Sequence, residues 1–193
     1  MKKKLFLTVF LLIILITDCV HLSYAQQYTG PAALILNHYA QRNFIAGSIS
    51  PADLDLIVQA GIRAPSAANR QPWHFTVVQN LELAKKIIPA CIDGNVLIVV
   101  SAPGDGRTNN VQILDCALAV QSIYLAAQAL GYGSRIYTGP IDTINNRYKG
   151  ELSLPDGYSA IALIRAGRMQ NTSDAVSSAS NRKRADELVT YIK

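Results

Sequence analysis

The sequence predicts a single α+β domain built from layers of helices and strands. Half of its 193 residues are hydrophobic and 16% are charged, so the chain can bury a sizeable core. The run Val96-Leu97-Ile98-Val99-Val100 is unbroken and mostly β-branched, which is typical of a strand covered on both faces. Helical and strand patterns are mixed without a regular βαβ rhythm, so the α+β class is favoured over a Rossmann fold.

The first half of the chain is expected to be mainly helical. Its pattern predicts one helix over about 32–42 and a second that begins with Ser50 as N-cap and Pro51 in the first turn. Residues at helical spacing form the inner face of the second helix: Leu54, Ile57, Val58 and Gly61. A strand is expected over 75–78, followed by a short helix that Asn80 caps.

The second half centres on the longest helical pattern, about 111–130. This pattern is apolar on nearly all sides, so we expect the helix to be buried in the core or in a dimer interface. Gly131 and Gly133 end it. Residues 136–138 then lead into Gly139-Pro140, where a sharp turn is expected. The remaining expected elements are, in order, a short helix at 142–148, a strand at 159–166, a polar loop or arm at 168–181 and a helix at 185–192.

The N-terminus has the composition of an export signal. Lys2, Lys3 and Lys4 precede an apolar run over 5–16, and Ser23-Tyr24-Ala25 offers small residues at the two positions that signal peptidase recognises. We therefore expect residues 1–25 to be a signal peptide and residues 26–193 to form the domain. The mature protein is then exported, to the periplasm or to the extracellular medium.

Two other interpretations of this segment stay open. About a dozen apolar residues fall short of the roughly 20 that span a bilayer as a helix, so an uncleaved anchor is less favoured. No stable membrane span is expected after cleavage. Cys19 follows the apolar run, as in a lipoprotein signal, but Asp18 occupies the place where a small residue is expected.

Charge and cysteine usage exclude several function classes. Removal of residues 1–25 lowers the net charge from +5 to +3 and leaves no long basic run, so no nucleic-acid partner is expected. Cys91 and Cys116 show neither a metal-type spacing nor a Cys-x-x-Cys pattern, so no metal site is expected. The sequence leaves open whether they form a disulfide, and Cys116 also fits a small buried hydrophobe.

The densest group of polar and rigid residues is Ala64-Pro65-Ser66-Ala67-Ala68-Asn69-Arg70-Gln71-Pro72-Trp73-His74-Phe75. Its two prolines restrict the backbone on either side of Asn69, which predicts a fixed loop suited to ligand binding. The run resembles the Ala-Pro-Ser-x-x-Asn-x-Gln-Pro-Trp-x-Phe signature of the FMN-dependent nitroreductase family. The resemblance covers nearly all of the chain after residue 25, and 115–131 is similar to the family's long central helix, which serves packing and dimerisation.

This resemblance implies a central, mostly antiparallel sheet flanked by helices, and an obligate homodimer with FMN at its interface. It implies ping-pong hydride transfer from NADH, NADPH or another donor to nitro compounds, quinones or similar electron-poor acceptors. The flavin carries this chemistry, so no side-chain nucleophile is required, and the sequence contains no nucleophile elbow or zinc-protease motif. Two alternatives remain: a non-catalytic exported flavin carrier, and a flavin-dependent dehalogenase or flavin-fragmenting enzyme on the same scaffold.

The resemblance also identifies cofactor-binding residues near the start of the domain. Family members show Arg-x-Ser-x-Arg/Lys-x-Phe where this chain reads His38-Tyr39-Ala40-Gln41-Arg42-Asn43-Phe44. Arg42 keeps the cation near flavin N1 and O2, where it stabilises charge on the reduced ring. His38 replaces the phosphate-binding arginine, and Ala40 lacks the usual hydroxyl. His38 is therefore either a phosphate ligand or a surface residue of the first helix.

The signature contributes Pro65, Ser66 and Asn69, which by resemblance reach the flavin from the partner subunit. Its later residues look like scaffold: Gln71, Pro72, Trp73 and Phe75. Ser66 fits a turn hydroxyl almost equally well. His74 is expected to point away from the core.

Two further groups complete the implied flavin site. Thr138 and Gly139 are placed by resemblance to offer main-chain N–H groups to flavin N5. Arg182 and Arg184, which precede the last helix, are expected to clamp the phosphate, although a basic cluster there can also be a solvated face.

Overall fold

The structure is a computed structural model that describes residues 30–106, 108–170 and 182–193. It divides into two compact units, one ending at Asn37 and one beginning at His38. The first contains helix α2 (Gly30–Asn37), which has no buried residue. The signal peptide expected over residues 1–25 and most of the arm expected over 168–181 lie outside the described residues.

The expected first helix over 32–42 is wrong in its second half, because α2 ends at Asn37. Residues 38–43 are non-helical, and their polar groups bond to distant parts of the chain. The Gln41 N–H donates to the Ser134 carbonyl (2.9 Å), and the Gln128 amide donates to the Tyr39 carbonyl (3.0 Å). These tertiary bonds replace the local bonds that helix continuation would supply.

A four-stranded sheet forms the centre of the second unit. Its strands are β1 (His74–Val78), β2 (Val96–Pro103), β3 (Gly133–Tyr137) and β4 (Tyr158–Gly167). They lie in the order β1-β2-β4-β3, and every neighbouring pair is antiparallel. The α+β class and the antiparallel sheet are therefore confirmed.

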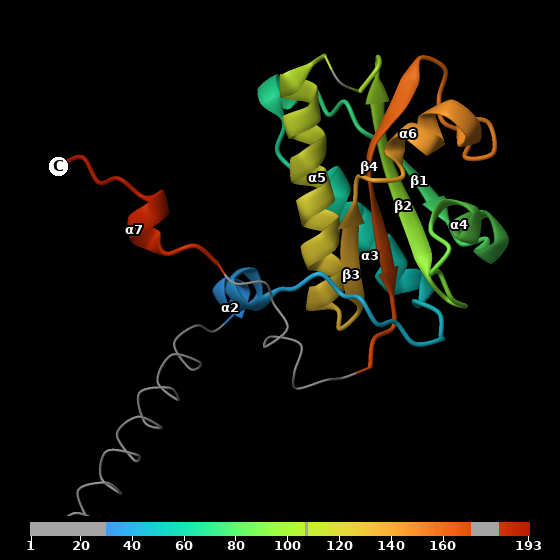
Figure 1. The fold of residues 1–193 in the computed structure, drawn as a ribbon, viewed down its shortest axis with the longest axis horizontal. Coiled ribbons are helices and arrows are strands. Elements are labelled where there is room, and N and C mark those ends of the chain that lie inside the picture. Colours follow the sequence, from blue (N-terminus) through green and yellow to red (C-terminus); the bar gives the residue numbers. More distant parts are fainter. Residues whose placement is uncertain (1–29, 107, 171–181) are drawn as a thin grey trace, which may run out of the picture. The chain divides into compact units, whose positions relative to one another are not determined.

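Two long helices cover one face of this sheet (Figure 1). They are α3 (Pro51–Ile62) and α5 (Asn110–Ala129). Ile57 of α3 and Ile123 of α5 are fully buried against Ile98 and other residues of β2. The expected inner stripe of α3 is confirmed, because Leu54, Ile57 and Gly61 are buried and Val58 packs against them.

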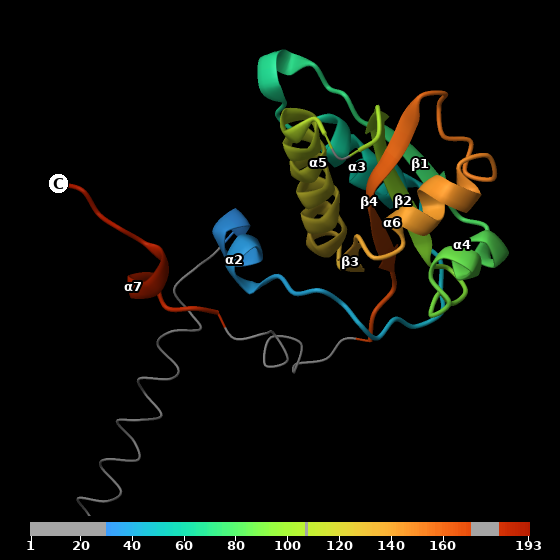
Figure 2. The same cartoon turned by 45° about the horizontal axis from the view of Figure 1, so that its top comes forward.

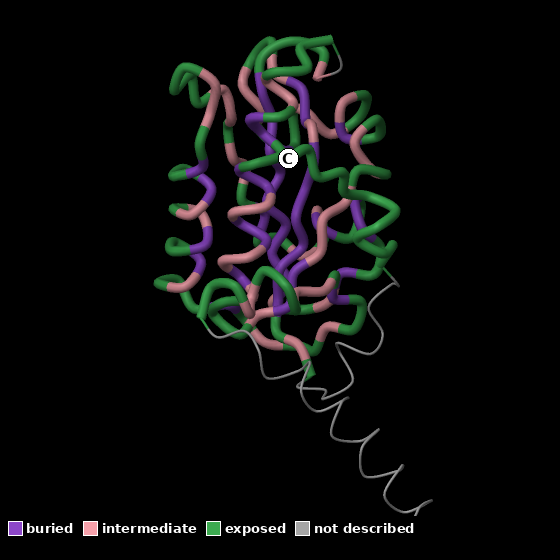
Figure 3. Tube along the Cα trace, turned by 90° about the vertical axis from the view of Figure 1, so that its left-hand side faces the viewer, coloured by how far each residue is buried: buried purple, intermediate pink, exposed green. Residues whose placement is uncertain are grey.

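Shorter helices cover the opposite face, as the turned view in Figure 2 shows. They are α4 (Leu81–Ile87), α6 (Ile141–Thr143) and the π-helix η2 (Ile144–Tyr148). Ala84 and Ile144 of these helices pack with Leu97 and Val99 of β2. The run 96–100 is thus buried on both faces, as its pattern predicts. Figure 3 shows the buried parts of the trace gathered in the interior of the second unit.

The predicted N-caps agree with the observed helix starts, whereas the predicted ends of the first and of the last helix do not. Ser50, Asn80 and Asn109 each accept a backbone N–H at an N-cap, from Asp53, Leu83 and Gln112 respectively. The expected final helix over 185–192 is wrong in length, because α7 spans only Ala185–Leu188. Val189 is extended, with φ −121° and ψ 128°, in keeping with the β-branched residues around it.

The two described cysteines lie on opposite sides of the sheet. Cys91 belongs to the apolar cluster on the α4 side, and Cys116 to the cluster beneath α3 and α5. Both thiols are free and buried. The disulfide that the sequence leaves open is therefore absent.

Candidate functional site

The signature segment forms a tight turn with unusual backbone angles. A short 3₁₀ helix, η1 (Ala67–Asn69), is the next element after α3 and begins five residues after its end. Ala68, Asn69 and Gln71 have φ values of 51°, 55° and 48°, in the left-handed region that non-glycine residues rarely adopt. Such conformations persist only where surrounding contacts fix them, and they are frequent at ligand sites.

Three sets of hydrogen bonds hold this turn. The Gln71 N–H donates to Ser66 Oγ (3.0 Å), and the Gln71 side-chain amide donates to Asn69 Oδ1 (3.0 Å). From outside the segment, Asp115 Oδ1 accepts the Ala67 N–H at 2.9 Å. Asp115 lies on α5 and is only 4% exposed. The turn is therefore anchored on the long helix by a buried carboxylate.

The turn presents its predicted ligand-binding residues outward. Pro65 and Asn69 are exposed, and Ser66 is half-buried. The Ser66 hydroxyl does serve as a turn hydroxyl, so its local role is established while its role toward a ligand stays a prediction. The expected scaffold role of Trp73 and Phe75 agrees with the core, since both pack on it and their rings stack at 6.4 Å between centroids. His74 is exposed, as expected.

A second group of predicted residues gathers around the C-terminal half of α5. Arg42 lies in the non-helical segment after His38, is exposed, and makes no hydrogen bond or ion pair to another described residue. The segment itself is fixed, because the Gln128 amide bonds both the Tyr39 carbonyl and Ser134 Oγ (3.0 and 2.9 Å). The cation is thus available to a ligand although its backbone is held.

His38 is not a surface residue of a helix, so that alternative is wrong. It is half-buried, and its Nδ1 lies 3.2 Å from the Tyr124 hydroxyl of α5, with the two rings edge to face at 5.3 Å. Burial raises the pKa of Tyr124, while the Gln128 side chain and the positive charge of Arg182 act in the opposite direction. Arg182 therefore lies near enough to act electrostatically on the same hydroxyl that contacts His38.

Two other predicted groups are Arg184 and the segment after β3. Arg184 binds Asp186 through two hydrogen bonds (3.0 and 2.9 Å) on an exposed surface, so its guanidinium already has an anionic partner. Thr138 and Gly139 follow β3 and are exposed. A Cβ added to Gly139 would meet no heavy atom within 4 Å, so the main chain there faces open space.

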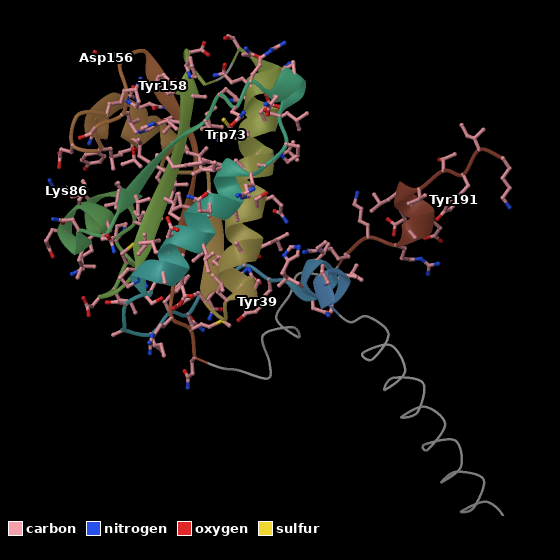
Figure 4. All side chains as sticks on the ribbon, turned by 180° about the vertical axis from the view of Figure 1, so that it is seen from behind. Tyr39, Trp73, Lys86, Asp156, Tyr158 and Tyr191 are labelled. Carbon is pink, nitrogen blue, oxygen red and sulfur yellow. The ribbon has the colours of Figure 1, made fainter. Side chains whose placement is uncertain are left out.

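The signature turn and the His38–Arg42 segment lie near opposite ends of α5 within one protomer. The turn is held by Asp115 and the segment by Tyr124 and Gln128. At about 1.5 Å per helical residue, Asp115 lies about 14 Å along the helix from Tyr124 and about 20 Å from Gln128. Figure 4 shows Trp73 of the signature toward one end of the helix and Tyr39 at the other. One protomer does not bring the two groups together.

Asp115 is the residue in this arrangement whose role the sequence reasoning missed. It contributes no motif, because its partner lies 48 residues away. A signal was nevertheless present: Asp115 precedes Ala119, Ile123 and Ala127 at intervals of four on the inner face of a helix. A carboxylate on a buried stripe needs a hydrogen-bond donor.

Comparison with known proteins assigns the chain to a family. The sequence model described as "Nitroreductase family" matches residues 35–102 and 92–168. A protein from Archaeoglobus fulgidus named "Putative NADH dehydrogenase/NAD(P)H nitroreductase" is 32% identical over 136 residues, which are 65% of this chain and 78% of that protein. A protein of the same name from Methanothermobacter thermautotrophicus is 32% identical over 123 residues, which are 59% of this chain and 64% of that protein.

Solved structures agree on the fold. A nitroreductase with bound FMN from Desulfitobacterium hafniense superposes with a TM-score of 0.71 at 23% identity, covering 86% of this chain and 100% of that one. A second nitroreductase with bound FMN, from Bacteroides fragilis, gives a TM-score of 0.65 at 21% identity over 86% and 100%. The family match, the sequence relatives and the antiparallel sheet with its two helical layers all agree, and the chain therefore belongs to the nitroreductase family.

Proposed function

We propose that this protein is an FMN-dependent oxidoreductase. In this proposal NADH, NADPH or another donor supplies hydride, and nitro compounds, quinones or similar electron-poor molecules accept it in a ping-pong cycle. The single observation that carries the proposal is Arg42, an exposed cation on a fixed backbone with no described partner. The names of the relatives from Archaeoglobus and Methanothermobacter and the FMN in two structural neighbours support it.

The residues present fit the chemical needs of FMN. A bound flavin supplies the hydride chemistry at its ring, so the protein has to bind the ring, hold charge near it and hold the phosphate. Arg42 would offer a cation to the pyrimidine edge, and the open main chain at Gly139 would offer an N–H group. His38 and Arg182, which both act on Tyr124, would bind the phosphate.

The separated residue groups support a homodimer that shares its sites. The signature turn of one protomer would complete the site formed by the His38–Arg42 segment of the other. The outer face of α5 and α3 carries exposed apolar side chains that a second copy would cover: Leu56, Val111, Leu114 and Leu118.

Leu114→Glu tests this dimer, because it places a charge in the proposed interface. Light scattering should then find monomers, and absorbance should show a lowered FMN content. Asn146→Glu, on the exposed part of η2, is the charge-matched control.

Spectroscopy of the purified full-length protein tests the activity. The proposal expects a yellow protein whose flavin absorbance bleaches with NADH or NADPH and returns on addition of a nitroaromatic compound or a quinone. Bound flavin that no donor reduces would favour the carrier alternative. Reduction without turnover of nitroaromatics, together with turnover of a halogenated substrate, would favour the dehalogenase alternative. A colourless protein that takes up no added FMN would overturn the proposal.

Arg42→Ala tests the residue that carries the proposal. A charge-assisted hydrogen bond contributes about 1.5–3 kcal/mol, so the variant should bind FMN about tenfold to a hundredfold more weakly. Its free energy of unfolding without FMN should match wild type, because the side chain is exposed. Arg147→Ala, which removes another exposed arginine, should alter neither quantity. Equal FMN affinity and reduction rate in Arg42→Ala and wild type would refute the assignment.

We also propose that the protein is exported after cleavage of residues 1–25. The apolar run over 5–16 supports this, since its length suits a signal peptide. Mass spectrometry of the protein from the periplasm or medium should then find Gln26 at its N-terminus. A chain that starts at Met1 in the cytoplasm would contradict the proposal, and a lipid on Cys19 would replace cleavage before Gln26 with anchoring.

A further inference from the structure

Asp115 is a buried ionisable residue that the proposed chemistry does not use. Only 4% of its surface is exposed, and it lies among apolar residues of α5. Its Oδ1 accepts one hydrogen bond, from the Ala67 N–H of the signature turn at 2.9 Å. Placing a carboxylate in such surroundings is costly, so the contact that it makes is expected to carry a specific role.

The geometry of the turn shows what this contact accomplishes. Ser66 is extended (φ −143°, ψ 154°), and the chain then reverses into the left-handed angles of Ala68 and Asn69. The other hydrogen bonds of the turn join residues within 66–71 and move with it. The bond to Asp115 ties the turn to a long helix of the core. It therefore fixes both the position and the orientation of Asn69.

We propose that Asp115 is a positioning residue that holds the signature turn in the conformation required for flavin binding. This inference rests on the proposed function for the identity of the ligand, whereas the effect on the turn itself is independent of FMN. The side-chain oxygen, and not the negative charge, is the essential group. Asp115→Asn would keep an acceptor at the same place, whereas Asp115→Ala would remove it.

Ala67 allows the same contact to be removed from its other end. Proline is tolerated in the first turn of a helix, and it favours an extended residue before it. Ala67 is the first residue of η1, and Ser66 before it is already extended. Ala67→Pro therefore deletes the N–H donor while the carboxylate of Asp115 and the core around it stay in place.

Hydrogen exchange of the flavin-free protein is the first measurement. Asp115→Ala and Ala67→Pro should each raise the exchange of amides in 68–71 at least tenfold, with α5 and β2 unchanged. Asp115→Asn should stay within about threefold of wild type. Val120→Ala, a truncation of a buried side chain five residues farther along α5, is the control for a general loss of packing. If Asp115→Ala raises exchange in α5 as much as in the turn, as that control should, the residue has a packing role only and the proposal is overturned.

FMN affinity is the second measurement, read from quenching of flavin fluorescence. Asp115→Ala and Ala67→Pro should each weaken binding at least tenfold, and the double variant should be no weaker than either single variant. If the double variant loses the product of the two single losses of affinity, Asp115 acts through a contact other than the Ala67 N–H, and the proposal is refuted. If Asp115→Ala does not fold, Ala67→Pro alone tests the proposal. Hydrogen exchange and FMN affinity equal to those of wild type in Ala67→Pro would then refute the proposal. A wild-type protein without FMN affinity would overturn the proposed function, while the exchange result would still test the anchor.

Discussion

Gly61 of α3 packs against Ile123 of α5, and replacing it by alanine has two opposing effects on stability. Alanine is favoured over glycine in a helix by about 1 kcal/mol. The added Cβ would, however, lie 2.7 Å from both Cδ1 and Cγ1 of Ile123 and 3.1 Å from Cζ of Phe75. Ile123 is fully buried, and overpacking of a tight core costs about 1–3 kcal/mol. Because two of the contacts are shorter than real Cβ contacts, we expect a net loss of about 1–2 kcal/mol.

Urea unfolding of the flavin-free protein measures this difference. Gly61→Ala should lower the midpoint with an unchanged slope, and Tm should fall by about 2–8 °C. Gly150→Ala is the control, because a Cβ there meets no atom within 4 Å, and its stability should equal or slightly exceed that of wild type. Ile123→Val removes one of the crowded atoms, so the double variant should lose less than the sum of its parts. A Gly61→Ala protein as stable as wild type would show that the surroundings accept the added methyl group without cost, and would refute the overpacking argument.

Two pH effects are also expected. Hydrogen bonds from Tyr132 and Ser50, both 2.7 Å long, hold the pKa of Asp53 in the folded protein below its usual 3.8. Their contribution to stability is therefore fully present above pH 3.8, and it is lost as the pH falls through the lowered pKa of the folded state. The Tm difference between wild type and Tyr132→Phe should therefore narrow below about pH 4, and a constant difference would contradict this. Burial, with a smaller effect of the Asp115 charge, raises the pKa of Cys116 from 9.0 to about 12. Stability should therefore fall as the pH rises from 9 to 12, because the unfolded chain loses this proton first. The Tm of Cys116→Ala should fall less than that of wild type over the same range.

Periodicity and capping patterns predicted most of the fold because those signals are local. The β-branched run at 96–100 and the Ser50 and Asn80 caps depend on neighbours a few residues away, and the structure confirms each of them. The segment after Asn37 was not predictable in this way. Its helical spacing continues to Arg42, but bonds from Gln128 and Ser134 hold its backbone in another conformation.

The candidate site likewise combines features that are encoded locally with contacts between residues far apart in the sequence. The exposed turn around Asn69 could be located from its prolines and its motif, since a fixed loop is encoded within a dozen residues. The contacts of His38 with Tyr124 and of Ala67 with Asp115 could not, because each joins residues far apart in the sequence. The assembly that would unite Asn69 with Arg42 involves a second copy, which pattern and spacing in one chain do not describe.

The separation of Cys91 and Cys116 bears on how the protein matures. With a sheet between the two sulfurs, oxidation could pair them only if the core were first taken apart. Folding of this domain thus yields the same product in reducing and in oxidising surroundings, and these two thiols place no demand on a disulfide-forming catalyst. The domain could therefore fold and bind its cofactor on either side of a membrane.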